Sequence, residues 1–127
     1  MQNFEELPMV VQRKDIKKVW KTWGFEEWIW NEEYCLKILK LDLGHASSYH
    51  KHQIKDEVLY VLSGQCTIFI SWDDDENKSV PRQMKIGDSL HIPVGLRHRI
   101  VPTSDLIIIE ASTHHKDSDS HRLSPGY

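Results

Sequence analysis

Residues 44–64 read GHASSYHKHQIKDEVLYVLSG, and this stretch decides how the whole chain is interpreted. Glycines stand at both ends, where tight turns between strands need them. Successive side chains of a strand alternate between its two faces, so His50 and His52 point to the same side. Glu57 then opens an apolar run at 58–62 that is typical of a second strand. The stretch therefore predicts two short strands that carry metal-ligating side chains.

A second stretch, residues 87–98, reads GDSLHIPVGLRH and ends in another histidine, His98. A His-x-His pair alone is more often two surface histidines than a metal pair, but here a Glu at fixed offset and a distant histidine accompany it. Three imidazoles and one carboxylate suit one divalent transition metal ion: zinc, manganese, iron, nickel or cobalt. They also leave coordination positions open for a ligand. We predict a metal site at His50, His52, Glu57 and His98.

The rest of the chain is punctuated by glycine and proline turns and has almost no helical period. Further short strands are expected at 34–43, 65–72, 83–86, 89–92, 98–101 and 106–111. This pattern predicts an all-β sandwich or barrel. We expect three parts: a lead-in segment at 1–18, a β-barrel at 19–113, and a polar, solvated tail at 114–127 that contains several histidines.

The two glycine-bracketed stretches resemble the paired motifs of the cupin superfamily, in which the first motif supplies two His and one Glu and the second supplies another His. The resemblance covers residues 21–112, as a single domain of the cupin type 2 kind. It implies a double-stranded β-helix, or jelly-roll barrel, with the four metal ligands inside.

A closer resemblance links the chain to type II mannose-6-phosphate isomerases and to the cupin domain at the C-terminal end of mannose-1-phosphate guanylyltransferases. It rests on Lys21, on the WGFEE run at 23–27, on Lys37 and on the HRI run at 98–100. The end of the chain, 117–127, matches the family only approximately. The resemblance implies metal-dependent interconversion of an aldose and a ketose phosphate, with a carbohydrate or sugar phosphate as the ligand.

Such a reaction needs a base to move a proton and a cation to hold the phosphate. We expect Lys37 and Arg122 to bind substrate, and Glu57 or His45 to act as the catalytic base. Arg99 follows a metal ligand directly, so strand alternation points it away from the site.

Two other functions use the same ligands. One is a metal-dependent dioxygenase, in which iron, nickel or copper activates O₂. The other is a non-catalytic cupin that binds a small ligand and has a closed metal site, whereas an enzyme needs an open position on the metal.

Size and composition exclude several classes of protein. The chain has 127 residues, which suffices for one domain, and a formal net charge of −3, which does not suggest a nucleic-acid partner. No apolar run reaches membrane length. Residues 1–8 lack the basic and apolar regions of a signal peptide. Cys35 and Cys66 fall in expected strands, so we predict buried free thiols and a cytoplasmic location.

Four tryptophans lie between Trp20 and Trp30, which is more apolar area than a small barrel buries alone. Surface of this kind often marks a contact with another protein. We therefore predict a homodimer that uses the N-terminal strand region. The alternative is that these rings cover the end of the chain's own barrel.

Overall fold

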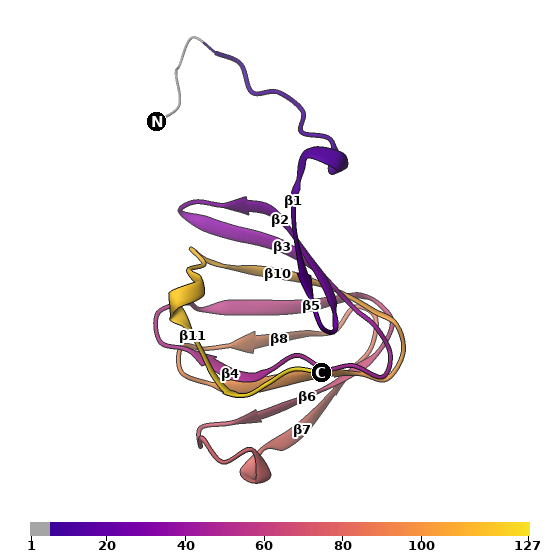
Figure 1. Ribbon diagram of the computed structural model, residues 1–127, viewed down its shortest axis with the longest axis vertical. Coiled ribbons are helices and arrows are strands. Elements are labelled where there is room, and N and C mark those ends of the chain that lie inside the picture. Colours follow the sequence, from indigo (N-terminus) through magenta and orange to yellow (C-terminus); the bar gives the residue numbers. More distant parts are fainter. Residues whose placement is uncertain (1–5) are drawn as a thin grey trace.

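The computed structural model describes residues 6–127 and confirms the all-β prediction. Within those residues eleven strands alternate with turns, and the helical segments are single 3₁₀ turns (Figure 1). The strands are β1 Lys17–Lys21, β2 Gly24–Asn31, β3 Tyr34–Leu41, β4 Tyr49–His52, β5 Glu57–Ser63, β6 Cys66–Ser71, β7 Val80–Met84, β8 Ser89–Ile92, β9 Arg97–Pro102, β10 Leu106–Thr113 and β11 Ser120–Ser124. The 3₁₀ turns are η1 Arg13–Asp15, η2 Glu76–Lys78 and η3 Asp117–Asp119. No helix in the described part of the chain is long and apolar enough to cross a membrane.

The strands form two antiparallel sheets that face each other. One sheet has the order β1-β2-β3-β10-β5-β8, and the other has the order β11-β4-β9-β6-β7. Consecutive strands often lie in different sheets, as in β3 to β4 or β5 to β6, so the chain winds around a common interior. This arrangement is the predicted jelly-roll barrel.

Alternation along the strands builds the core between the sheets. In β3, buried and half-buried residues alternate, and the buried set is Cys35, Lys37, Leu39 and Leu41. The apolar cluster joins residues of both sheets: Trp23, Leu39, Leu41, Leu59, Val61, Cys66, Ile68, Met84, Ile92, Leu96, Ile100, Leu106 and Ile108. The two cysteines are free and buried, as predicted. Apolar packing therefore occupies part of the interior and leaves the polar part of the same faces for a site.

Most strand predictions agree with the structure to within a few residues, but one strand is displaced. The expected strand 83–86 is instead β7, Val80–Met84, which includes Pro81. Proline cannot donate a ladder hydrogen bond and is tolerated in edge strands. Since β7 is an edge of its sheet, Pro81 fits there.

The predicted solvated tail after residue 113 is partly wrong, because β11 is a member of a sheet. It pairs antiparallel with β4, which would otherwise be the sheet edge. The carboxylate of Asp119 anchors the segment by accepting hydrogen bonds from the backbone N–H groups of Gln53, Ile54 and Lys55. This segment is polar because backbone groups make many of its contacts and because β11 is only partly buried. Sequence periodicity shows neither property.

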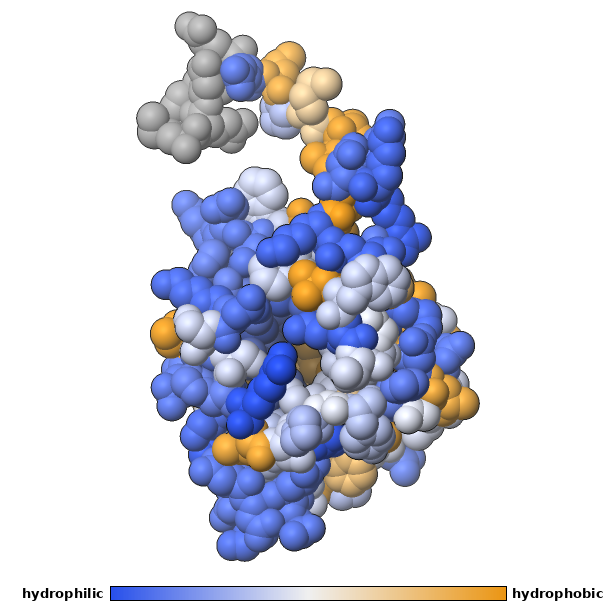
Figure 2. Space-filling model, viewed as in Figure 1, coloured by the Kyte–Doolittle hydropathy of each residue, from blue (hydrophilic) through white to orange (hydrophobic). Residues whose placement is uncertain are grey.

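The lead-in segment ends earlier than expected, since β1 begins at Lys17. Residues 1–5 of the predicted segment lie outside the described part of the chain. An arm made of residues 6–12 extends away from the barrel (Figures 1 and 2). Arg13 fixes its base through two hydrogen bonds, of 2.8 and 2.9 Å, to the carboxylate of Glu27.

Candidate metal centre

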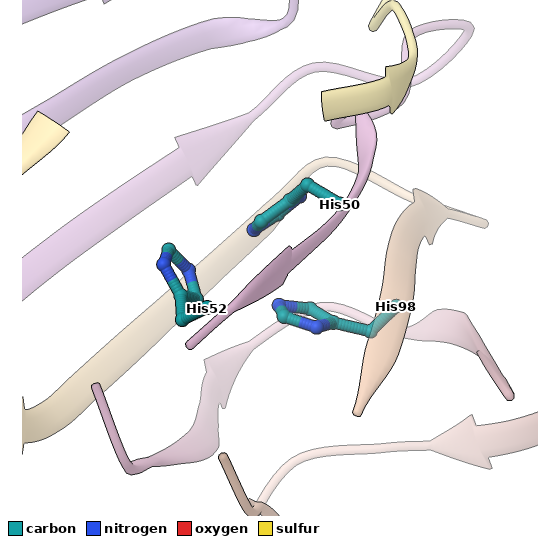
Figure 3. A group of neighbouring side chains, drawn as sticks. All are labelled: His50, His52 and His98. Carbon is teal, nitrogen blue, oxygen red and sulfur yellow. The ribbon is translucent and has the colours of Figure 1, made fainter. Parts of the chain in front are cut away.

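Three histidines from two neighbouring strands converge inside the barrel. His50 and His52 project from the same face of β4, and His98 projects from β9, where it is the register partner of His50. One nitrogen of each imidazole lies within 4.8 Å of the others (Figure 3). Strand alternation and one cross-strand pairing are therefore sufficient to bring together ligands that are far apart in the sequence.

Hydrogen bonds to the backbone orient the three rings. Nδ1 of His50 lies 3.0 Å from the carbonyl oxygen of Ser48, and Nδ1 of His98 lies 3.0 Å from that of Leu96. Nδ1 of His52 lies 3.2 Å from the carbonyl oxygen of Asp119. A carbonyl only accepts, so each Nδ1 carries a proton, and in a neutral ring Nε2 then offers a lone pair. Such outer contacts are those that orient metal-binding histidines.

The environment keeps the imidazoles of His50 and His52 neutral. Burial, followed by the proximity of His98 and His52, lowers the pKa of His50 well below its usual value. Burial, followed by the charge of Lys55, lowers the pKa of His52 to about 4. Neutral imidazole is the form that binds a metal. Both rings are thus ready ligands at neutral pH.

Glu57 lies beside the histidines but is shared with another group. Its Oε1 is 3.1 Å from Nε2 of His98, and its Oε2 is 3.8 Å from Nε2 of His52. The same Oε2 forms an ion pair of 2.9 Å with Nζ of Lys55. Burial alone would raise the pKa of Glu57, but Lys55 and His98 outweigh it, and the pKa lies well below its usual range.

Sequence reasoning missed Lys55, which is buried next to the site. Its ammonium also lies 3.0 Å from Oε2 of Glu110 and 3.1 Å from Nδ1 of His115. Burial lowers the pKa of Lys55, but Glu57 and Glu110 more than compensate, so the pKa is raised and the ammonium stays charged. The available signal was alternation carried backwards from Glu57, which puts Lys55 on the same face.

Glu110 is a second carboxyl group at the site, and sequence reasoning missed it as well. It projects inward from β10 and is 5% exposed. Burial, followed by the negative charge of Glu57, raises the pKa of Glu110. Glu57 and Glu110 both contact Lys55, and their pKa values are shifted in opposite directions.

A cavity of about 720 Å³ contains the metal centre and its neighbours. Both sheets and the β1–β2 turn line it, and its polar lining includes the three histidines, Glu26, Lys37, Lys55, Glu57, Glu110, His115, Asp117 and Arg122. Trp20, Lys21 and Trp23 contribute to the wall near the β1–β2 turn. The cavity is large enough for a small polar molecule next to a metal ion.

Lys37 faces this cavity, as expected, but it already has partners. Its side chain is 1% exposed, and Nζ lies 3.3 Å from Oε1 of Glu26. The same Nζ lies 4.1 Å from the centre of the Trp28 ring, whose indole N–H also donates to Glu26. Burial alone would raise the pKa of Glu26, but Lys37 and Trp28 lower it. A substrate phosphate would have to compete with Glu26 for this lysine.

The other expected site residues are separated. Arg122 lines the cavity from β11, where it is exposed and is the register partner of His50. His45 is exposed and is not part of the cavity lining, so the structure does not bring it to the site as a base. Arg99 points to the opposite face of β9, as predicted, and pairs with Glu76 at 2.6 Å.

The donor set fits a divalent transition metal ion. Three Nε2 lone pairs converge, and an ionised carboxylate oxygen faces one of them at 3.1 Å. Lone pairs and a negative oxygen repel each other unless a cation or proton lies between them. Imidazole nitrogens with a nearby carboxylate are ligands that such ions prefer. His50, His52 and His98 would hold the ion, with Glu57 adjacent.

Comparison with known proteins agrees with this geometry. A family model described as a cupin domain matches residues 37–112. Among solved structures, the capsular polysaccharide assembling protein CapF from Staphylococcus aureus superposes with a TM-score of 0.76 at 19% identity, over 86% of this chain and 32% of that one. Oxalate decarboxylase from Bacillus subtilis gives a TM-score of 0.72 at 16% identity, over 94% of this chain and 34% of that one.

A shorter structural neighbour is KdgF from Halomonas sp., with a TM-score of 0.63 at 19% identity over 74% of this chain and 81% of that one. The chain spans about a third of the length of CapF and of the decarboxylase. At these identities the structural matches establish the fold. The search of curated proteins gives no match.

Proposed function

Because this chain belongs to the cupin family, we propose that it is a metal-dependent enzyme that acts on a phosphorylated sugar. The reaction is an aldose–ketose isomerisation of the mannose-6-phosphate isomerase type. The observation that carries the proposal is the composition of one cavity, which joins three metal-binding imidazoles to an exposed guanidinium, that of Arg122. The structural similarity to CapF, a capsular polysaccharide assembling protein, supports a carbohydrate ligand.

The phosphate would be bound at the cavity opening rather than deep inside. Arg122 is exposed and forms no ion pair within residues 6–127, and a guanidinium binds phosphate through two parallel hydrogen bonds. Lys21, on the same cavity wall, adds positive charge. Lys37 instead positions Glu26, since the two are already paired.

Isomerisation moves a proton between neighbouring carbons, and a metal ion supplies a Lewis acid that polarises the sugar oxygens. Two carboxyl groups with oppositely shifted pKa values divide the acid and base work in many enzymes. Here Glu110, with its raised pKa, is the better proton carrier at neutral pH. Glu57 stays ionised and accepts a hydrogen bond from a substrate hydroxyl.

The proposal is tested with protein loaded with zinc or manganese, in a thermal-shift panel of aldose and ketose phosphates paired with the same sugars lacking phosphate. We expect the phosphorylated members to raise Tm more. Incubation in D₂O followed by NMR should then show aldose–ketose interconversion, with deuterium entering the carbon next to the carbonyl when the exchanging proton equilibrates with solvent.

Absence of both a phosphate-dependent shift and interconversion by fully metallated protein would contradict the isomerase proposal. O₂ consumption by an iron-loaded sample would then identify the dioxygenase alternative. Ligand binding without turnover would identify a binding protein. The free, buried thiols of Cys35 and Cys66 support a reducing compartment, and we propose the cytoplasm.

We also propose a homodimer. The outer face of the six-stranded sheet carries a row of apolar side chains across three strands, in which Ile109 is the register partner of both Ile38 and Tyr60. The arm exposes 85% of Leu7 and 92% of Val10. The arm begins at this face, because Arg13 binds Glu27, the register partner of Ile38.

A second copy of the chain would bury both the apolar sheet face and the apolar side chains of the arm. In a two-fold dimer the same face meets itself, and each arm lies on the other subunit. The exposed apolar side chains on this face and on the arm include Leu7, Met9, Val10, Val11, Val58, Tyr60 and Leu62. Contiguous surface of this kind marks a protein contact.

A further inference from the structure

Arg99 is buried although it points to the outer face of β9. Its side chain is 6% exposed, and its Nε lies 2.6 Å from Oε1 of Glu76 in the η2 turn. The other nitrogens of the guanidinium bind residues from the end of the chain. Nη2 donates to Oγ of Ser124 at 2.9 Å, and Nη1 donates to the carbonyl oxygen of Pro125 at 3.2 Å. The ring of Tyr127 lies 5.6 Å from the guanidinium carbon. One buried side chain thus contacts three residues at the end of β11 and just after it.

Beyond β11 the chain lies against the loop that precedes β4 (Figure 1). The backbone N–H and carbonyl of Tyr127 pair with the carbonyl and N–H of Ala46, at 3.0 and 2.8 Å. Gly126 fits so closely that a Cβ would lie 2.8 Å from the carbonyl oxygen of Ala46 and 3.0 Å from the amide nitrogen of Ser48. Gly126 also lines the cavity of the metal centre. The segment that Arg99 holds from outside therefore forms part of the cavity wall.

Arg122 lies between two fixed points of this segment. Before it, the carboxylate of Asp119 binds the backbone that follows β4, and after it, Ser124 binds Arg99. The pairing of β11 with β4 is irregular between Arg122 and Ser124, so the ladder alone does not hold the far end. We propose that Arg99 is a positioning residue, which fixes the C-terminal segment from the outer face of the sheet so that Arg122 meets an anionic ligand in the cavity. This inference rests on the proposed binding of a sugar phosphate.

The physical reason is preorganisation of Arg122. A residue on an edge strand such as β11 loses conformational freedom when it binds an anion, and this loss weakens binding. A backbone that is fixed on both sides of Arg122 has already lost that freedom. Arg99 holds the segment firmly, because hydrogen bonds from a charged donor are stronger than those from a neutral one. Glu76 supplies the counter-charge that a buried guanidinium needs.

Hydrogen exchange of Arg99→Met tests whether Arg99 fixes the segment. The variant keeps an unbranched side chain but removes the hydrogen bonds. We expect the amide protons of Ala46 and Tyr127 to exchange about tenfold faster or more, because their paired hydrogen bonds open locally, while amides of β5 keep their wild-type rates. Arg97→Met is the matched control, since Arg97 shares this face of β9 but pairs with Asp74 at 2.7 Å rather than with the C-terminal segment. Unchanged exchange in Arg99→Met, or equally fast exchange in Arg97→Met, would overturn the inference.

A double-mutant cycle with Arg122→Gln tests whether Arg99 acts through Arg122. In calorimetry on zinc-loaded protein, Arg99→Met should raise Kd for mannose 6-phosphate by about tenfold and leave Kd for Zn²⁺ unchanged. The double variant should bind mannose 6-phosphate about as weakly as Arg122→Gln alone. Fully additive losses would contradict the inference, because a general effect on the fold does not depend on Arg122. A wild-type Kd in Arg99→Met would contradict it as well.

Gly126→Ala displaces the same segment by a different route, and it decides the question if Arg99→Met does not fold. The added Cβ pushes the segment away from Ala46, so exchange should again be faster and the loss of affinity should again be non-additive with Arg122→Gln. Wild-type exchange and affinity in Gly126→Ala would count against the inference. If the wild-type protein binds no sugar phosphate, the proposed function fails, and the exchange rates of Arg99→Met still decide whether Arg99 fixes the segment.

Discussion

Arg122 on β11 is the register partner of His50 on β4, so a residue from the predicted tail stands directly beside the metal centre. The side chain of Arg122 is exposed and lines the same cavity as the imidazoles. The segment expected to be solvated thus supplies the cation best placed to meet an anionic ligand.

Arg122→Gln should weaken binding of a phosphorylated sugar without removing the metal. Loss of one charged hydrogen-bonding partner costs about 1.5–3 kcal/mol, or roughly ten- to a hundredfold in affinity. Calorimetry on metal-loaded protein measures the change. Arg82→Gln is the matched control, because Arg82 is exposed on β7, outside the cavity lining. Equal affinities for wild type and Arg122→Gln would exclude Arg122 as the phosphate ligand.

Replacing His50 and His52 together by alanine should abolish metal binding. The two residues supply two of the three converging nitrogens, and elemental analysis of purified protein measures the result. Bound metal stabilises the native state by about 2.7 kcal/mol when its free concentration is a hundred times Kd. Added zinc should therefore raise Tm in wild type and leave the double variant unchanged. Stoichiometric metal in the double variant would refute the assignment.

The stability of the metal-free protein should fall between pH 7 and pH 5. The pKa of His52 is about 4 in the folded state, whereas an unfolded histidine titrates near 6.5. Below pH 6.5 the unfolded state binds the additional proton, so stability decreases as pH falls, until the folded pKa is reached. His52 alone contributes a loss of about 2 kcal/mol over this interval.

Urea unfolding at the two pH values, in the presence of a chelator, measures this loss. His52→Gln removes the titrating group and should show a smaller difference between pH 7 and pH 5 than wild type. The same pH dependence in both proteins would show that other groups are responsible.

The proposed dimer is tested by placing a charged side chain at the centre of its apolar contact surface. Tyr60→Lys puts a charge in the apolar row on the outer face and should give a monomer of 15.0 kDa in light scattering, whereas we expect twice that mass for wild type. Val80→Lys is the control, since Val80 is 45% exposed on β7, the edge strand of the other sheet. A monomeric wild-type protein at micromolar concentration would disprove the proposal.

Two glycines in turns allow a matched stability test. Gly64 and Gly87 have φ values of +86° and +88°, which other residues adopt at a cost of about 1–2 kcal/mol. A Cβ at Gly87 meets nothing within 4 Å, but at Gly64 it would clash with the backbone carbonyl of Asp105. Gly64→Ala should therefore lower the free energy of unfolding by at least about 1 kcal/mol more than Gly87→Ala. Equal losses in chemical denaturation would show that this turn adjusts freely.

Local patterns were sufficient for the all-β class and for the shared face of His50 and His52. Alternation is a property of a single strand, so the spacing of His50 and His52 placed both on one face before any tertiary contact was known. The same rule correctly pointed Arg99 away from the site. Glycine and proline turns marked the boundaries of the expected strands closely, except at β7, where an edge position accommodates Pro81, whereas β11, in the expected tail, was not predicted.

The partners of the charged groups were decided by tertiary structure alone. Lys55 and Glu110 are 55 residues apart in the chain, and their ion pair exists because β10 and β5 are neighbours in one sheet. The pairing of Lys37 with Glu26 and the pairing of β11 with β4 likewise depend on strand neighbours that no local period encodes. The sequence by itself determined which side chains point inward, because strand geometry alternates successive side chains between the two faces of a sheet. Which of them bind a metal, a phosphate or each other depends on distances across the barrel, and only the folded chain sets those distances.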